Sequence, residues 1–294
     1  MWRIRRGIAD FLAPAAAGLW LLLLLQAALT QLATALSTRT PNRNSYIPLS
    51  PIERVLLQDR LEGIKASIGN QYSNQIRENK VNTFIFPGAG GVDELVEELQ
   101  SELSSSNKNN KFNDVTTTPL IVDWKEQRGS ILTAGYDSEA VGESIAMCVD
   151  DDDSSDMELE VVHYIGISVG GFAANAAARW TCQQQDPSSE VMLKVRLTLL
   201  DPFCGRGLTG PNYGRDNFGI HGTTAIHLLN TDDPVPTTND PLPNCFTVDV
   251  TQAAERNKFI PPPGDSMHSW PLAYFTRYFD ESKFTVQRGT VVQV

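Results

Sequence analysis

The sequence is poor in the residue patterns that bind metals. Its four cysteines, Cys148, Cys182, Cys204 and Cys245, are far apart, and no Cys-x-x-Cys pair occurs. A structural zinc site or a dithiol redox motif usually carries such a pair. The acidic run at 150–156 also lacks the ligand spacing and the glycine of an EF-hand loop. We therefore expect no metal and no cofactor.

Positive charge is scarce as well. The chain has 24 lysines and arginines against 35 aspartates and glutamates, which gives a formal net charge of −11. The one basic cluster lies within the first six residues. Such a surface repels nucleic acid, so we expect no nucleic-acid partner. Nothing in the composition implies a protein partner.

Long apolar runs are absent except near the N-terminus. Arg3, Arg5 and Arg6 precede an apolar stretch from Phe11 to Leu25, and the small-x-small segment 33–35 follows. This order is typical of a secretory signal peptide over residues 1–35. An uncleaved membrane anchor is the alternative, since helical character can continue to residue 36. Both interpretations export the chain, either to a secreted or lumenal location or to a membrane.

Export allows disulfides, because the number of cysteines is even and the compartment is oxidising. Cys148 and Cys182 are expected to end two helices that flank one strand, at the same end of the sheet. A Cys148–Cys182 bridge is one of three pairings, and it would leave Cys204 with Cys245.

Two regions follow this leader. Residues 36–80 form a polar lead-in with one helix, for which Pro51 is a suitable first residue. From 81 to 294, apolar runs of strand length alternate with helical patterns, which predicts an α/β domain with a mostly parallel central sheet and helices on both faces. The expected strands are 84–86, 120–122, 161–165, 193–199, 225–229 and 246–250, and the expected helices are 92–103, 138–147 and 172–180.

A Gly-x-Ser-x-Gly motif at 166–170 lies between an expected strand and an expected helix. This context is that of a nucleophile elbow, in which the serine sits on a tight turn that small neighbours permit. Ser168 is therefore the candidate nucleophile. A glycine-rich loop at 86–91 follows the first strand, and we expect the backbone N–H groups of Ala89 and Val169 to form an oxyanion hole.

A nucleophilic serine needs a base and an acid. The chain has four histidines; His163 and His227 lie inside expected strands, and His221 lies in a loop beside a glycine. His268 comes late in the chain, after the serine, which is the order that α/β-hydrolases use. For the acid, Asp201 follows one strand and Asp232 and Asp233 follow the next, and either place can serve a histidine.

Several segments resemble the pancreatic-lipase family. Val122-Asp123-Trp124 is similar to the Val-Asp-Trp that ends a strand in that family, and 141–146 is similar to its Val-Gly-x-x-Ile-Ala helix. The elbow, the step at Asp201 and His268 follow in the same order, over roughly 81–279. The resemblance implies the α/β-hydrolase fold and favours Asp201 as the acid. The segment 233–236 instead resembles the acid loop of fungal-type lipases, which favours Asp232 or Asp233. We predict the triad Ser168, His268 and Asp201, with Asp233 or Asp232 as the alternative acid.

The predicted function is that of a lipase or esterase that cleaves lipid acyl esters through an acyl-enzyme. A thioesterase is the alternative, because Pro87-Gly88 replaces the His-Gly of the family, and a non-catalytic lipid-binding protein is the second. Only seventeen residues separate Val250 from His268, which is too short for the family's lid. We therefore expect an open site that acts on soluble short-chain esters without needing an interface. Contact with a membrane or lipid surface is compatible with such a site.

Overall fold

The structure, a computed structural model, describes residues 51–105, 118–130, 133–150, 160–186, 188, 192–206 and 212–294. The expected signal peptide or anchor at 1–35 and the start of the lead-in at 36–50 lie outside these residues. Among the described helices, none combines the length and the apolar character needed to cross a bilayer.

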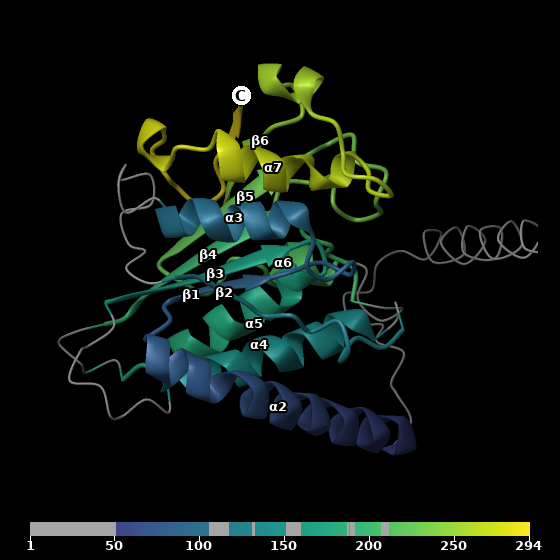
Figure 1. Cartoon of the computed structure of the whole chain (residues 1–294), viewed down its shortest axis with the longest axis vertical. Helices are drawn as coiled ribbons and strands as arrows, with labels where there is room; N and C mark the ends of the chain where they lie inside the picture. The colour runs from purple at the N-terminus through teal and green to yellow at the C-terminus, as the bar shows by residue number, and fades with distance from the viewer. Residues whose placement is uncertain are drawn as a thin grey trace, which may run out of the picture. The chain divides into compact units, whose positions relative to one another are not determined.

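A single seven-stranded sheet organises the described chain, in the order β2-β1-β3-β4-β5-β6-β7 (Figure 1). Every neighbouring pair is parallel, so the carboxyl ends of all the strands lie at one edge. The expected α/β class with a parallel sheet is confirmed. The strands are β1 (Thr83–Phe86), β2 (Leu120–Ile121), β3 (Val161–Ile167), β4 (Lys194–Leu200), β5 (Thr224–Leu229), β6 (Phe246–Asp249) and β7 (Val291–Gln293).

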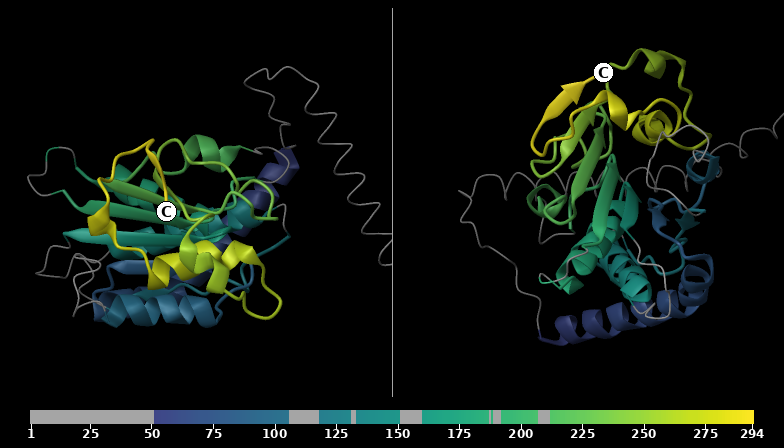
Figure 2. Two further views of the ribbon diagram at one scale, coloured as in Figure 1. Left: turned by 90° about the horizontal axis from the view of Figure 1, so that it is seen from above. Right: turned by 90° about the vertical axis from the view of Figure 1, so that its left-hand side faces the viewer.

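Helices cover both faces of this sheet (Figures 1 and 2). One face carries α4 (Ala134–Asp150) and α5 (Gly170–Gln184), with α2 (Pro51–Asn79) packed outside α4. The other face carries α3 (Glu94–Ser105) and α7 (Trp270–Arg277), which contact each other. The other helices in the described part of the chain are short: α6 (Tyr213–Asn217) and the 3-10 turns η3 (Ala254–Lys258), η4 (Met267–Ser269) and η5 (Glu281–Lys283).

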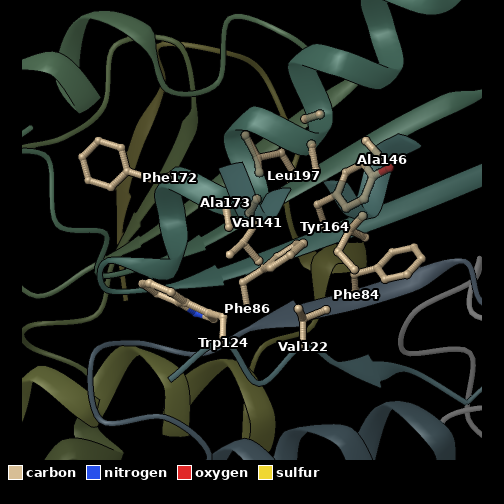
Figure 3. Close-up of a cluster of buried hydrophobic side chains, with 14 of the residues drawn as sticks. Phe84, Phe86, Val122, Trp124, Val141, Ala146, Tyr164, Phe172, Ala173 and Leu197 are labelled. Atoms are coloured by element: carbon tan, nitrogen blue, oxygen red, sulfur yellow. The ribbon is translucent and has the colours of Figure 1, made fainter. Parts of the chain in front are cut away.

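The strands alternate their side chains between two apolar cores. Phe84 and Tyr164 belong to the core under α4 and α5 (Figure 3), whereas Ile85 and Ile165 belong to the core under α3 and α7. All four side chains are fully buried, and each contributes roughly 1.5–3 kcal/mol of burial free energy. Burial on both faces explains why these strands read as continuous apolar runs.

Helix α2, the helix expected between residues 36 and 80, packs on this domain. It begins at Pro51, as expected, but it continues to Asn79 and buries Ile64, Ile68 and Tyr72 in the core that α4 and α5 share with the sheet. The same compact unit contains α2 and the sheet. The helix that we placed before residue 81 therefore belongs to the core.

None of the four cysteines forms a disulfide, so the expected bridges Cys148–Cys182 and Cys204–Cys245 are wrong. Cys148, Cys204 and Cys245 are buried among apolar side chains, and the Cys204 thiol donates instead to the carbonyl of Pro202 at 3.4 Å. These thiols act as small core side chains.

Candidate active site

The topology of the sheet indicates where a ligand would bind. The chain passes from β1 to β2 on one side and then to β3 on the other, so the strand order reverses at β1. In open parallel sheets, ligands bind beyond the carboxyl ends of the strands at such a reversal. The loop after β1 and the turn after β3 meet at this place, and they contain the glycine-rich loop and Ser168.

Ser168 occupies the tip of a sharp turn between β3 and α5. Its φ is +52°, in the left-handed region that a non-glycine residue rarely adopts. A Cβ at Gly166 would lie 2.6 Å from the Cα of Gly171, and a Cβ at Gly170 would lie 2.2 Å from the carbonyl oxygen of Phe86. Both glycines of the motif are thus required by contact with backbone. The expected strand, tight turn and helix are present, with the strained conformation that functional turns store.

Hydrogen bonds hold this turn in place from several directions. The N–H of Ser168 donates to the carbonyl of Leu200 at 3.0 Å, and the carbonyl of Ser168 accepts from Phe203 at 3.1 Å. The Ser138 hydroxyl, on α4, donates to the carbonyl of Val169 at 3.0 Å. The turn is therefore fixed to both β4 and α4.

The glycine-rich loop lies against the serine. A Cβ at Gly88 would be 3.2 Å from the Cβ of Ser168, and Gly88, Ala89 and Val169 border one cavity with it. The indole N–H of Trp124 donates to the carbonyl of Pro87 at 3.0 Å and so anchors the loop. Val169 precedes the first turn of α5, where backbone N–H groups have no partner within the helix. This arrangement suits an anion beside Ser168.

His268 reaches the same cavity from η4, just before α7. Its backbone N–H donates to the Ser266 hydroxyl, and the carbonyl of Met267 accepts from the Asn230 amide at 3.0 Å. The ring's Nε2 is buried and has no hydrogen-bond partner among the described residues. In the neutral ring, that nitrogen can accept a hydroxyl proton. The role of Asn230 in holding this turn was not foreseen from the sequence.

Two carboxylates, rather than one, contact His268. Its Nδ1 lies 3.0 Å from Asp201 Oδ2 and also forms a short hydrogen bond with Asp233 Oδ2. The third expected alternative, Asp232, does not join them, because it pairs with Arg256. The structure thus brings Ser168 and His268 to one cavity and both Asp201 and Asp233 to the histidine.

The two carboxyl groups differ in charge. Burial raises the pKa of Asp201 to about 8, despite the hydrogen bond with His268. Burial also raises the pKa of Asp233, but hydrogen bonds with His268, Asp201 and the N–H of Val235 outweigh it and lower that pKa to about 2. Burial thus favours the protonated form of Asp201, and the hydrogen bonds favour the charged form of Asp233. Burial lowers the pKa of His268, but the two carboxyl groups outweigh it and raise that pKa to about 9.

The same three side chains can be considered as metal ligands. One nitrogen of His268 and one oxygen each of Asp201 and Asp233 lie within 4.8 Å of one another. A metal there would displace the Nδ1 proton that both carboxyl groups now accept. The direct hydrogen bonds satisfy these atoms, so we interpret the cluster as a histidine with two orienting carboxyl groups.

The cavity has a volume of about 810 Å³. Its apolar walls include Ile167, Phe203, Val235 and Leu272, and the loop 262–265 borders it near His268. Cavities of this size bind small molecules or single acyl groups.

The other histidines lie elsewhere. His163 is buried in β3, where its Nε2 lies 2.8 Å from the hydroxyl of Thr198, and His227 is buried in β5. Burial lowers the pKa of both rings, which keeps them neutral.

No family model, no curated protein and no solved structure matches this chain.

Proposed function

We propose that this chain is a serine-dependent carboxylic ester hydrolase with an α/β-hydrolase fold. The observation that carries the proposal is Ser168, held at φ +52° on a strand-to-helix turn and bordering the same cavity as the free Nε2 of His268. The positions of the groups support it, since the serine follows β3, the carboxyl groups follow β4 and β5, and the histidine follows β6.

In the proposed reaction, Nε2 of His268 accepts the Ser168 hydroxyl proton while Oγ bonds to the ester carbonyl carbon. The backbone N–H groups of Ala89 and Val169 stabilise the negative carbonyl oxygen. The oxyanion then re-forms the carbonyl, the ester C–O bond breaks, and His268 returns the proton to the leaving alcohol. Water attacks the acyl-enzyme by the same steps, which releases the acid and restores Ser168.

The proposed substrates are lipid or other apolar acyl esters. The apolar walls of the cavity suit an acyl group, and the loop 262–265 is too short to close over it as a separate domain. A thioester is the second candidate, because the Pro-Gly-Ala-Gly-Gly loop at 87–91 resembles that of thioesterases and the same groups would act on a thioester. Export through residues 1–35 remains a prediction.

Fluorophosphonate labelling tests the proposal. The wild-type protein should form one covalent adduct, located by peptide mass spectrometry on Ser168, and hydrolyse para-nitrophenyl butyrate. Ser168→Ala should lose the adduct and reduce kcat by about 10⁶-fold, because the nucleophile is gone. Ser188→Ala, in the exposed turn before β4, is the matched control and should label normally.

The contrary outcome is equally clear. A well-folded wild-type protein that neither labels nor hydrolyses any ester or thioester, but binds fatty acid, would be a lipid-binding protein on the same scaffold.

A further inference from the structure

An arginine borders the cavity beside its apolar walls. Arg128, in the loop between β2 and α4, borders the same cavity as Ser168 and His268. Its side chain is half-buried. Within the described chain, no carboxylate or carbonyl pairs with it, whereas the nearby Arg60 and Arg206 are both in ion pairs. Its guanidinium nitrogens are not among the buried polar atoms that lack a partner, so they are accessible from solvent, and a bound ligand can supply an anion.

The loop that carries Arg128 is rigidly built. Arg60 on α2 forms two hydrogen bonds to the buried carboxylate of Asp137, at 2.8 and 3.1 Å, and also donates to the carbonyl of Gln127 at 3.1 Å. Asp137 in turn accepts from the N–H of Gly129 at 2.8 Å. The residues on both sides of Arg128 are thus fixed by one ion pair.

Gly129 makes this arrangement close-packed. A Cβ there would lie 2.5 Å from the Thr133 hydroxyl and 2.6 Å from the Arg60 guanidinium. Arg128 therefore borders the cavity from a backbone that hydrogen bonds hold on both sides. Such preorganisation is what a binding residue needs, because little conformational freedom is lost when the ligand binds.

Two carboxylates also border the cavity, but both are exposed and used locally. Asp93 accepts the N–H of Val96 at the start of α3, and Asp265 accepts the N–H of Ser266. A second cation, Lys125 in the Arg128 loop, lies over Gly91, where a Cβ would be 3.1 Å from its side chain. The half-buried charge at this wall of the cavity is therefore positive.

We propose that Arg128 binds an anionic group of the substrate, so that the preferred ester carries a carboxylate or a phosphate in addition to the bond that is cleaved. The inference rests on the proposed hydrolase function and specifies its substrate class. The guanidinium offers two parallel N–H donors, which match both anions. The apolar walls would hold the carbon chain between the anion and the ester.

Matched ester pairs test this proposal. In the carboxylate arm, mono-para-nitrophenyl esters of glutaric, adipic and pimelic acid are compared with para-nitrophenyl esters of unsubstituted acids of equal length. In the phosphate arm, dihexanoyl phosphatidic acid is compared with dihexanoylglycerol. We expect kcat/KM to favour the anionic member of at least one arm by roughly tenfold to hundredfold, as a charged hydrogen bond allows. The arm that shows the preference identifies the anion.

Variants assign the preference to Arg128. Arg128→Gln should abolish it by slowing only the anionic ester, and Arg128→Lys should retain part of it. Arg77→Gln, at the exposed end of α2, is the matched control and should keep the full preference. Free adipate or glycerol phosphate should also inhibit hydrolysis of the neutral ester by the wild type, and should inhibit Arg128→Gln much less.

Three results would overturn the role of Arg128 while leaving the hydrolase function intact. The wild type could hydrolyse neutral and anionic esters equally in both arms. Alternatively, Arg128→Gln could lose the same factor in kcat/KM on the neutral and the anionic ester, or it could keep the preference for the anionic ester. If no ester is hydrolysed and Ser168 does not label, the proposed function itself has failed.

Discussion

The loops after β4 and β5 each bring one aspartate to the same nitrogen of His268, but they treat that aspartate differently. Asp201 directly follows β4, has a φ of +46°, and accepts one backbone N–H, from Asn230 at 3.2 Å. Asp233 lies in a turn, accepts the N–H of Val235 at 3.0 Å, and lies 3.0 Å from the Thr238 hydroxyl. Both side chains are buried. The loop with more donors holds the charge, and the other holds the proton.

This comparison explains how two carboxyl groups can share one histidine. Two carboxylates in contact cannot both ionise at low cost, so one proton stays between them. Asp201 can then donate to Asp233, while Asp233 accepts from His268 and fixes its tautomer. The two loops thus form one orienting group, and each can be tested against the other.

The largest expected effect comes from removing both carboxyl groups. Asp201→Asn with Asp233→Asn should lower kcat by about 10⁴-fold, because no carboxylate remains to hold the histidine tautomer and stabilise the imidazolium. Asp233→Asn alone should cost less, roughly 10²-fold, because Asp201 can ionise in its place. Asp201→Asn alone should cost least, since an amide replaces a protonated acid. Steady-state kinetics on one soluble ester measure all three.

Asp232→Asn is the matched control for that series, because Asp232 neighbours Asp233 but pairs with Arg256 at the surface. It should keep wild-type activity. Equal losses in Asp201→Asn and Asp233→Asn would contradict the division of charge between the loops, and a larger loss in Asp201→Asn would reverse it.

The second largest expected effect is on the pH dependence of the rate. The base must be neutral, and the carboxyl groups raise the pKa of His268 above its ordinary value of 6.5, to about 9. We expect kcat/KM to rise with pH through an apparent pKa above 6.5. Asp233→Asn removes a charge that raises this pKa, so its rising limb should move to lower pH. Asp201→Asn should move it less. A wild-type limb at or below 6.5 would contradict the arrangement.

The smallest effect concerns stability. The folded pKa of Asp201 is raised to about 8, above its ordinary 3.8, so the folded state binds more protons than the unfolded state between these values. The contribution of Asp201 to the free energy of unfolding should therefore fall as pH rises from about 4 to about 8. Denaturant titrations at several pH values should show a flatter profile in Asp201→Asn. An unchanged slope would show that Asp201 is ionised in the folded protein.

The features that the sequence predicted correctly depend on residues close together in the chain. Alternating strand and helix patterns predicted the parallel sheet, because burial on both faces forces continuous apolar runs such as 84–86. The motif at 166–170 predicted a tight turn, because only glycine avoids the backbone contacts found on either side of Ser168. The short strand β7 was missed, since its three partly exposed residues carry little periodic signal.

Other features depend on which segments meet in space. The sequence favoured Asp201 and kept Asp232 and Asp233 as alternatives. In the folded chain, both Asp201 and Asp233 contact His268, whereas Asp232 pairs with Arg256. The predicted disulfides are not formed, although Cys204 and Cys245 lie in the same apolar core, because their pairing depends on how the folded chain places each thiol. Arg128 carried no signal at all, because its position depends on an ion pair between residues 60 and 137. Local patterns determine turns and strands; the charge of a site depends on long-range contacts that only the folded chain creates.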